Sequence, residues 1–268
     1  MFGLQIRYLS FFFGLISILS FFNILYSYYL NLYLNLDIYY WSFSISFIVS
    51  IIFYKVGVNE KKPSIYSKIL TVFLGYILLP LILSIPFYFS IYNLTFLNSF
   101  FESISGFTST GFTIFSNIKN IDQSLILWRS TTQWLGGMGI VVLTITVLPL
   151  LGSGGINLFK AESPGPTADR LTPRFQDTAK LLWVVYSGLT LLETVMLYFS
   201  GLSFYSALNH SLTTLSTGGF SVSNSSVSEM AQSAKWIIIL FMFIAGISFT
   251  LIFLGFVFGY LGFGKLVF

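Results

Sequence analysis

Cysteine is absent from this chain of 268 residues, and histidine occurs once, as His210. Without cysteine the chain holds no disulfide framework and no thiolate metal site. A single histidine leaves no cluster of the kind that binds zinc or non-haem iron. The sequence also shows no nucleophile–base pair and no cofactor motif. We therefore expect neither an enzyme nor a bound cofactor.

Charged residues are scarce as well. They make up 8% of the chain, whereas a soluble domain carries about 25%. Hydrophobic residues reach 55%, so the composition predicts an integral membrane protein surrounded by lipid. The formal charge of +4 forms no basic arm and no aromatic–basic motif, so no nucleic-acid partner is expected.

Six apolar segments approach the ~20 helical residues that cross a bilayer core. They lie near Tyr8–Tyr29, Tyr39–Tyr54, Ile69–Ile91, Leu127–Leu151, Leu181–Phe199 and Trp236–Gly259. The first is too long for a signal peptide and precedes no small-residue cleavage site, so we interpret it as an uncleaved helix. The fold class is therefore predicted to be all-α and polytopic.

A short polar phrase occurs twice between these segments, as Ser109-Thr110-Gly111 and as Ser216-Thr217-Gly218. Aligning Gly111 with Gly218 gives two copies of one pattern: a span, a short apolar stretch, the polar phrase and another span. One copy alone is a common turn tripeptide. Two copies in the same context favour backbone that lines a water-filled path inside the membrane. Non-helical backbone at that depth is tolerated only when it is buried in protein or lines such a path.

The short stretches before the phrases, Leu97–Ser105 and Phe204–Thr213, are too short to cross a bilayer. We interpret each as a re-entrant half-helix that ends in mid-membrane. The C-terminal end of a helix carries about half a negative charge, which favours a cation. Extended backbone beyond it offers carbonyl oxygens that replace the hydration shell of the ion, and glycine permits the positive φ and close approach that this needs.

Lysine and arginine predict the orientation, because they are enriched in cytoplasmic loops. If six helices alternate, most of the 13 basic residues share one side: Arg7, Lys55, Lys61, Lys62, Lys68, Lys160, Arg170, Arg174, Lys180 and Lys265. Only Lys119, Arg129 and Lys235 fall opposite. The N-terminus is therefore expected in the cytoplasm and both polar phrases at the outer side.

Several long phrases are specific to one family. FFESISGFTSTGFT, ILWRSTTQWLGGMGIVVLTITVLPLLG, NLFKAESPGPTADRLTPRFQDTAKLLW and LTTLSTGGFS resemble the membrane subunit of Trk/Ktr-type bacterial potassium-uptake systems. The resemblance implies an N-terminal helix pair followed by four helix–pore-loop–helix repeats, of which this chain holds two, the N-terminal half. We expect a truncated or split product rather than a half that associates with itself.

The same resemblance implies a domain plan. Residues 1–62 would form the N-terminal transmembrane helix pair, 63–159 the first helix–pore-loop–helix repeat, 160–180 a cytoplasmic connection that contains Pro164-Gly165-Pro166, and 181–268 the second repeat.

The expected selectivity filter comprises Ser109, Thr110, Gly111, Phe112, Ser216, Thr217, Gly218 and Gly219. Potassium would lie at Thr110, Gly111, Thr217 and Gly218, and in related plant transporters a glycine at the position of Gly111 goes with potassium preference. Glu102, Arg129 and Gln133 are expected to support the pore loops. For Arg129 an interfacial anchor is an equal alternative, and for Glu102 direct ion contact is the second interpretation.

Three further features have interpretations of their own. Glu193, in the fifth span, is a weak candidate for an intramembrane functional acid. His210 is interpreted as a packed histidine rather than a ligand or proton relay. The small residues of Gly136-Gly137-Met138-Gly139 are interpreted as a helix-packing site.

The expected function is potassium uptake through a pore-forming subunit of the bacterial inner membrane, with K+ as the transported ion. The alternative is a non-conducting structural or regulatory subunit that pairs with a second polypeptide. Expected partners are membrane lipid, a cytosolic nucleotide-binding regulatory subunit and, for the full-length subunit, a second copy in a homodimer.

Overall fold

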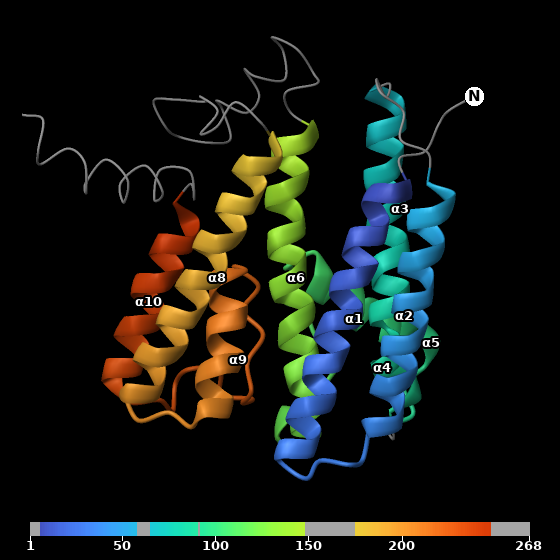
Figure 1. Cartoon of the computed structure of the whole chain (residues 1–268). Helices are drawn as coiled ribbons and strands as arrows, with labels where there is room; N and C mark the ends of the chain where they lie inside the picture. The colour runs from blue at the N-terminus through green and yellow to red at the C-terminus, as the bar shows by residue number, and fades with distance from the viewer. Residues whose placement is uncertain (1–5, 58–64, 91, 148–174, 248–268) are drawn as a thin grey trace, which may run out of the picture.

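The computed structural model describes residues 6–57, 65–90, 92–147 and 175–247. Within these ranges all regular secondary structure is helical, as the all-α prediction requires. Figure 1 shows long helices side by side along one axis, with shorter helices such as α9 beside them.

The chain begins with an antiparallel hairpin of α1 (Ile6–Tyr29) and α2 (Leu36–Val56). Serines on the facing surfaces hold the two helices together. The Ser50 hydroxyl donates to the Ser10 carbonyl at 2.7 Å, and the hydroxyls of Ser20 and Ser42 lie 3.2 Å apart. Such small residues let two helices approach closely in an apolar environment.

The first repeat contains α3 (Ile65–Leu83), α4 (Ile85–Phe89), α5 (Phe96–Phe107), the 3-10 turn η1 (Ile118–Asn120) and α6 (Gln123–Val147). The second contains α8 (Phe175–Phe199), α9 (Phe204–Leu215) and α10 (Gln232–Gly246). The side chains of Thr95 and Ser203 cap the short helices α5 and α9 by accepting from a backbone N–H of the first turn, which fixes where each one starts.

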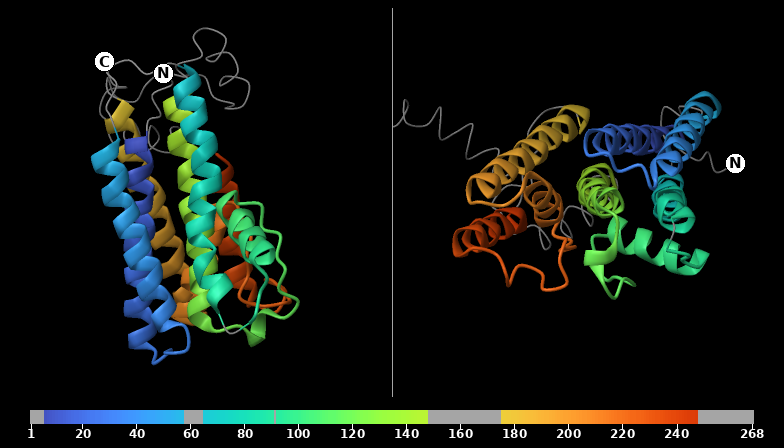
Figure 2. Two further views of the ribbon diagram at one scale, coloured as in Figure 1. Left: turned by 90° about the vertical axis from the view of Figure 1, so that its right-hand side faces the viewer. Right: turned by 90° about the horizontal axis from the view of Figure 1, so that it is seen from below.

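The two short helices occupy the same place in their repeats. In Figure 1, α5 and α9 rise from the lower end of the molecule to about mid-height, and the chain then returns to the lower end before α6 and α10 begin. The view from below in Figure 2 shows the repeats side by side, and α6 packs against both α5 and α9. This contact brings the segments after α5 and α9 together.

Within the described ranges, four segments are long and apolar enough to cross a membrane: Leu9–Tyr29, Leu36–Val56, Ile69–Phe89 and Leu182–Phe199. They match four of the six predicted spans. The second is longer than predicted, and the third consists of α3 and α4 with a break at Ser84. Large apolar side chains such as Phe73 and Phe243 point outward, exposed by 60% and 71%, as expected for surfaces that face lipid.

The other two predicted spans differ from the structure. The helix predicted for Leu127–Leu151 begins earlier, at Gln123, and is described to Val147. The last helix begins at Gln232 and stops at Gly246, where Ile247 is extended, so the predicted span to Gly259 is not one continuous helix. Its remainder lies outside the described residues, as does the Pro-Gly-Pro phrase. The predicted connection 160–180 also ends too late, because α8 already begins at Phe175.

Candidate functional site

Two loops follow the short helices, and we call residues 108–113 loop 1 and residues 216–221 loop 2. Their amide groups turn back onto the helices that precede them. In loop 1, Thr110 and Gly111 donate to the Ser105 carbonyl at 2.9 and 3.4 Å. In loop 2, Gly218 and Gly219 donate to the Thr213 carbonyl at 3.0 and 3.2 Å. Each loop therefore caps its helix with consecutive N–H groups.

The two loops share one backbone conformation, and it corrects the alignment of the repeats. Gly111 and Gly219 both have positive φ, of 84° and 75°, and so do Ser109 and Thr217, at 53° and 56°. Gly111 thus corresponds to Gly219, and the predicted pairing with Gly218 is wrong by one residue. The second loop has two adjacent glycines, and matching the letters Ser-Thr-Gly selected the first of them.

The turned-back amides leave carbonyl groups of both loops without a donor. Among the described residues, no hydrogen bond ends on the carbonyl oxygens of Ser109, Thr110, Gly111, Thr217, Gly218 or Gly219. One carbonyl farther along each loop does accept a hydrogen bond. The Phe112 carbonyl accepts from the Ser105 hydroxyl at 2.6 Å, and the Ser221 carbonyl accepts from Arg129 at 3.2 Å.

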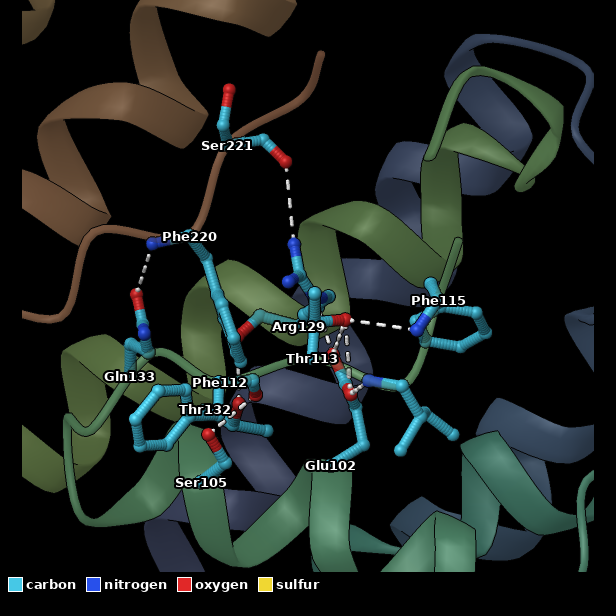
Figure 3. A network of polar contacts seen from close by, with 11 residues as sticks. Glu102, Ser105, Phe112, Thr113, Phe115, Arg129, Thr132, Gln133, Phe220 and Ser221 are labelled. Atoms are coloured by element: carbon cyan, nitrogen blue, oxygen red, sulfur yellow. Dashed lines mark hydrogen bonds and ion pairs between the residues drawn. The ribbon is translucent and has the colours of Figure 1, made fainter. Parts of the chain in front are cut away.

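The carboxylate of Glu102 holds loop 1 (Figure 3). It accepts from the Thr113 hydroxyl at 2.9 and 3.1 Å and from the Ile114 amide at 2.9 Å. Arg129 completes the group, because its Nε lies 2.6 Å from Glu102 Oε1. Glu102 is 0% exposed and Arg129 is 2% exposed. A buried carboxylate of this kind needs a cation and several donors, and here it has both.

Arg129 also reaches loop 2. Its terminal nitrogen donates to the Ser221 carbonyl, and its Cζ lies 3.5 Å from the centre of the Phe220 ring, a cation–π arrangement. An interfacial anchor would leave this guanidinium exposed, so that interpretation of Arg129 does not fit its burial.

Gln133, one helical turn after Arg129, contacts the same loop (Figure 3). Its Oε1 accepts from the Phe220 amide at 3.1 Å. Gly218 lies so close that a Cβ there would collide with the Gln133 side chain. A Cβ on Gly111 would in turn collide with the Gly218 carbonyl oxygen. The backbones of the two loops are therefore in direct contact beside Gln133.

Five of these contacting residues were not singled out from the sequence: Ser105, Thr113, Ile114, Phe220 and Ser221. A signal for three of them, Thr113, Phe220 and Ser221, was present. Once Gly111 is aligned with Gly219, each glycine is followed by phenylalanine and then by a hydroxyl residue. The side chains of the two phenylalanines differ, since Phe112 is 68% exposed and Phe220 is 3% exposed.

Among the described residues, no hydrogen bond joins the remaining candidates to loops 1 and 2. Glu193 is 0% exposed, and neither carboxylate oxygen has a hydrogen-bond partner. His210 is 4% exposed and its Nε2 is likewise unpaired. The glycines of α6 do serve packing, because a Cβ at Gly136 would collide with the Phe107 carbonyl and one at Gly137 would crowd Ser216.

The fold is that of a helical membrane protein with two glycine-containing loops, whose carbonyl groups include several that accept no hydrogen bond from the described residues. A family model for TrkH, described as a cation transport protein, matches residues 41–258. The chain therefore belongs to the TrkH family of cation transport proteins, which is not a family of enzymes.

Individual proteins named as Trk system components are also similar to this chain in sequence. The chain is 40% identical over 171 residues to the Trk system potassium uptake protein TrkH of Salmonella typhimurium, covering 63% of this chain and 35% of that protein. It is 35% identical over 196 residues to the Trk system potassium uptake protein TrkG of Escherichia coli, covering 69% of this chain and 40% of that protein.

A solved structure is also similar. The crystal structure of the potassium transporter TrkH from Vibrio parahaemolyticus matches with a TM-score of 0.79 at 27% identity, over 95% of this chain and 52% of that one. The chain thus spans about half of this structure and 35 to 40% of the two relatives above. These comparisons support a bacterial membrane protein.

Proposed function

We propose that this chain supplies two loops of a selectivity filter for potassium uptake. The observation that carries the proposal is the row of carbonyl oxygens in loops 1 and 2 that accept no hydrogen bond from the described residues. Dehydrating K+ requires several such oxygens at fixed positions. Ser109, Thr110 and Gly111 provide them from loop 1, and Thr217, Gly218 and Gly219 from loop 2.

The helices behind the loops supply the favourable electrostatics. The C-terminal ends of α5 and α9 lead directly into loops 1 and 2, and the partial negative charge at these ends attracts a cation. The positive charge of Arg129 is neutralised by Glu102 at 2.6 Å, so it opposes the cation less than an unpaired arginine would. Glu102 has its oxygens occupied by three donors, which favours support of loop 1 over direct ion contact.

The orientation in the membrane follows from the same arrangement. Arg7 and Lys55 lie at one end of the helix bundle, at the start of α1 and the end of α2, whereas Lys119 and Lys235 lie near the end where α6 and α10 begin. The wider set of basic residues listed in the sequence analysis favours the first end as the cytoplasmic one, with 10 of the 13 on that side if six helices alternate. In this proposal loops 1 and 2 face the outside, α5 and α9 are re-entrant half-helices, and the domain plan holds with α8 beginning at Phe175.

Two loops make an incomplete ring around an ion, so the proposal includes further loops from elsewhere. The relatives named potassium uptake proteins are longer than this chain. A cytosolic nucleotide-binding subunit and a homodimer of the full-length subunit are proposed as partners. The second candidate function is a non-conducting subunit that pairs with another polypeptide, which the incomplete ring supports. Native mass and single-channel recording separate the two, because a monomer that passes no current would exclude autonomous conduction.

The filter assignment is tested by uptake in bacteria that need K+ supplied through this locus. Gly111→Asp and Gly218→Asp place a side chain against the facing loop or against Gln133, so Rb+ uptake and growth at low K+ should be lost. Gly201→Asp is the matched control, because Gly201 has a φ of 100°, lies outside the loops and has open space around its Cβ position. Unchanged uptake and selectivity in the loop variants would show that these glycines do not line the ion path.

A further inference from the structure

The two loops are held by different means, although their backbones correspond. Loop 1 is held by its own half-helix, because Glu102 of α5 binds Thr113 and Ile114. The same position of α9 is occupied by His210, whose Nε2 has no hydrogen-bond partner. The group that would bind the end of loop 2 from within its own repeat is therefore missing.

Loop 2 is held instead by a helix of the other repeat. Gln133 of α6 accepts from the Phe220 amide at 3.1 Å, and Arg129 of α6 donates to the Ser221 carbonyl at 3.2 Å. The two residues are four apart and so lie on one face of the helix. Both contacts fall directly after Gly219, at Phe220 and Ser221.

The helix that follows α9 offers no replacement. In the corrected alignment Ile237 and Phe241 of α10 stand where Arg129 and Gln133 stand in α6. Neither side chain can donate or accept a hydrogen bond. Among the described residues, the side-chain contacts that hold Phe220 and Ser221, at the end of loop 2, thus come from one face of α6.

We propose that Gln133, acting with Arg129, is a positioning residue that fixes the carbonyl groups of loop 2 relative to those of loop 1. Ion selectivity then depends on a contact between repeats, and not only on the loops themselves. This inference rests on the proposed function, since it concerns the same filter. Gln133 itself need not touch the ion, because its Oε1 is engaged by Phe220.

The Gln133→Leu variant is the direct test. Leucine keeps the approximate size of the side chain, and because Gln133 Nε2 has no partner, only the acceptor for the Phe220 amide is lost. A net hydrogen bond of ordinary strength corresponds to about a fivefold change in an equilibrium. We expect the ratio of K+ to Na+ uptake to fall about fivefold at an unchanged amount of membrane-inserted protein.

Two variants separate positioning from mere packing. Gln133→Glu keeps an oxygen acceptor and should retain most of the selectivity that Gln133→Leu loses, whereas a packing role predicts that both variants, of similar size, retain it. Gln123→Leu is the matched control, because Gln123 lies exposed at the start of the same helix and its substitution should leave the uptake ratio unchanged. If Gln133→Leu does not reach the membrane, Gln133→Asn, which withdraws the acceptor by one methylene, should show the same fall.

A second-site change tests why loop 2 depends on α6. His210→Glu places a carboxylate at the position of α9 that corresponds to Glu102 in α5. Ser221 and Val222 correspond to Thr113 and Ile114, the two residues of the chain segment that Glu102 binds. Combined with Gln133→Leu it should restore part of the lost selectivity by holding loop 2 from its own half-helix. Recovery in the double variant supports the inference, and a double variant no better than Gln133→Leu contradicts it.

The outcomes also distinguish this inference from the proposed function. If the unaltered protein, expressed from its full chromosomal locus, takes up K+ and Gln133→Leu has the same K+ to Na+ ratio, the positioning role is wrong and the filter stands. Equal loss of selectivity in Gln133→Leu and Gln133→Glu also overturns it. If the unaltered protein moves no K+ at all, the proposed function itself fails.

Discussion

Loop 1 and loop 2 present nearly the same backbone and are held in place by different chemistry. In both, two consecutive amides bind one carbonyl of the preceding helix. Beyond that point loop 1 ends on a buried carboxylate of its own repeat, whereas loop 2 ends on a carboxamide and a guanidinium of its neighbour. Two copies of a repeated unit can therefore share one backbone geometry although one loop is held by a helix of its own repeat and the other by a helix of the neighbouring repeat.

Arg129 binds both Glu102, which holds loop 1, and the Ser221 carbonyl of loop 2, so its loss should have the largest effect. Arg129→Met leaves the Glu102 carboxylate buried without a cation, which costs about 3–5 kcal/mol, and also frees the Ser221 carbonyl. We expect little folded protein in detergent, measured by size-exclusion profile and melting temperature. Recovery of Arg129→Met at wild-type yield and melting temperature would contradict the idea that this ion pair joins the loops.

The second-largest effect is expected at Gly111 and Gly219. These glycines correspond in the two loops, but their substitution should reduce uptake to different extents. Gly111→Ala places a Cβ against the Gly218 carbonyl oxygen, in addition to the strain of a φ of 84°, so Rb+ uptake should be abolished. Gly219→Ala has a φ of 75° and open space around the Cβ, so only the strain of about 1–2 kcal/mol remains, and uptake should be reduced but measurable.

Gly201→Ala provides the control for this pair, because it has the same kind of strain outside the loops. Its uptake per folded molecule should be normal. Equal loss in Gly111→Ala and Gly219→Ala would mean that backbone strain, rather than contact between the loops, determines the effect.

Thr113→Val probes the anchor of loop 1 alone. It removes one hydroxyl that donates to Glu102 while Ile114 and Arg129 still bind the carboxylate. A hydrogen bond to a charged group contributes about 1.5–3 kcal/mol, so a lower melting temperature is expected. Ser221→Ala is the counterpart in loop 2 and should matter less, because the contact of Ser221 with Arg129 uses its carbonyl. A larger fall in melting temperature for Ser221→Ala than for Thr113→Val would contradict this expectation.

The smallest effect is expected at the outer ends of the loops. The Asn224 side chain accepts from the Ile118 amide at 2.7 Å and donates to Asn117 at 3.0 Å, so Asn224→Ala should cost about 1 kcal/mol. Lys119→Ala removes only an exposed ion pair with Glu229 and should leave the melting temperature unchanged. A greater loss from Lys119→Ala than from Asn224→Ala would contradict this ranking.

Much of the fold could be predicted from the sequence because apolar length and basic loops are local signals. Four predicted spans and the two short helices lie close to their observed bounds. The position where α10 ends could not be predicted, since the largely apolar sequence continues past Gly246 with no charged residue before Lys265.

The candidate site, too, could be predicted only in part from the sequence. Glu102, Arg129 and Gln133 could be selected from the sequence, but their partners could not. The contact of Gln133 with Phe220 joins residues far apart in the chain and depends on how the two repeats pack. The alignment of Gly111 with Gly219 likewise became clear only from the φ values, because the adjacent Gly218 offers an equally good match of letters.

The central claim is that carbonyl groups of both loops line one path and bind dehydrated cations along it. The most direct measurement is anomalous scattering from Rb+ or Tl+ in crystals of the protein expressed from its full locus. The account predicts peaks beside the carbonyls of Thr110 and Gly111 and of Gly218 and Gly219, which disappear in Gly111→Asp. Peaks that lie away from both loops, in a protein that takes up K+, would contradict it.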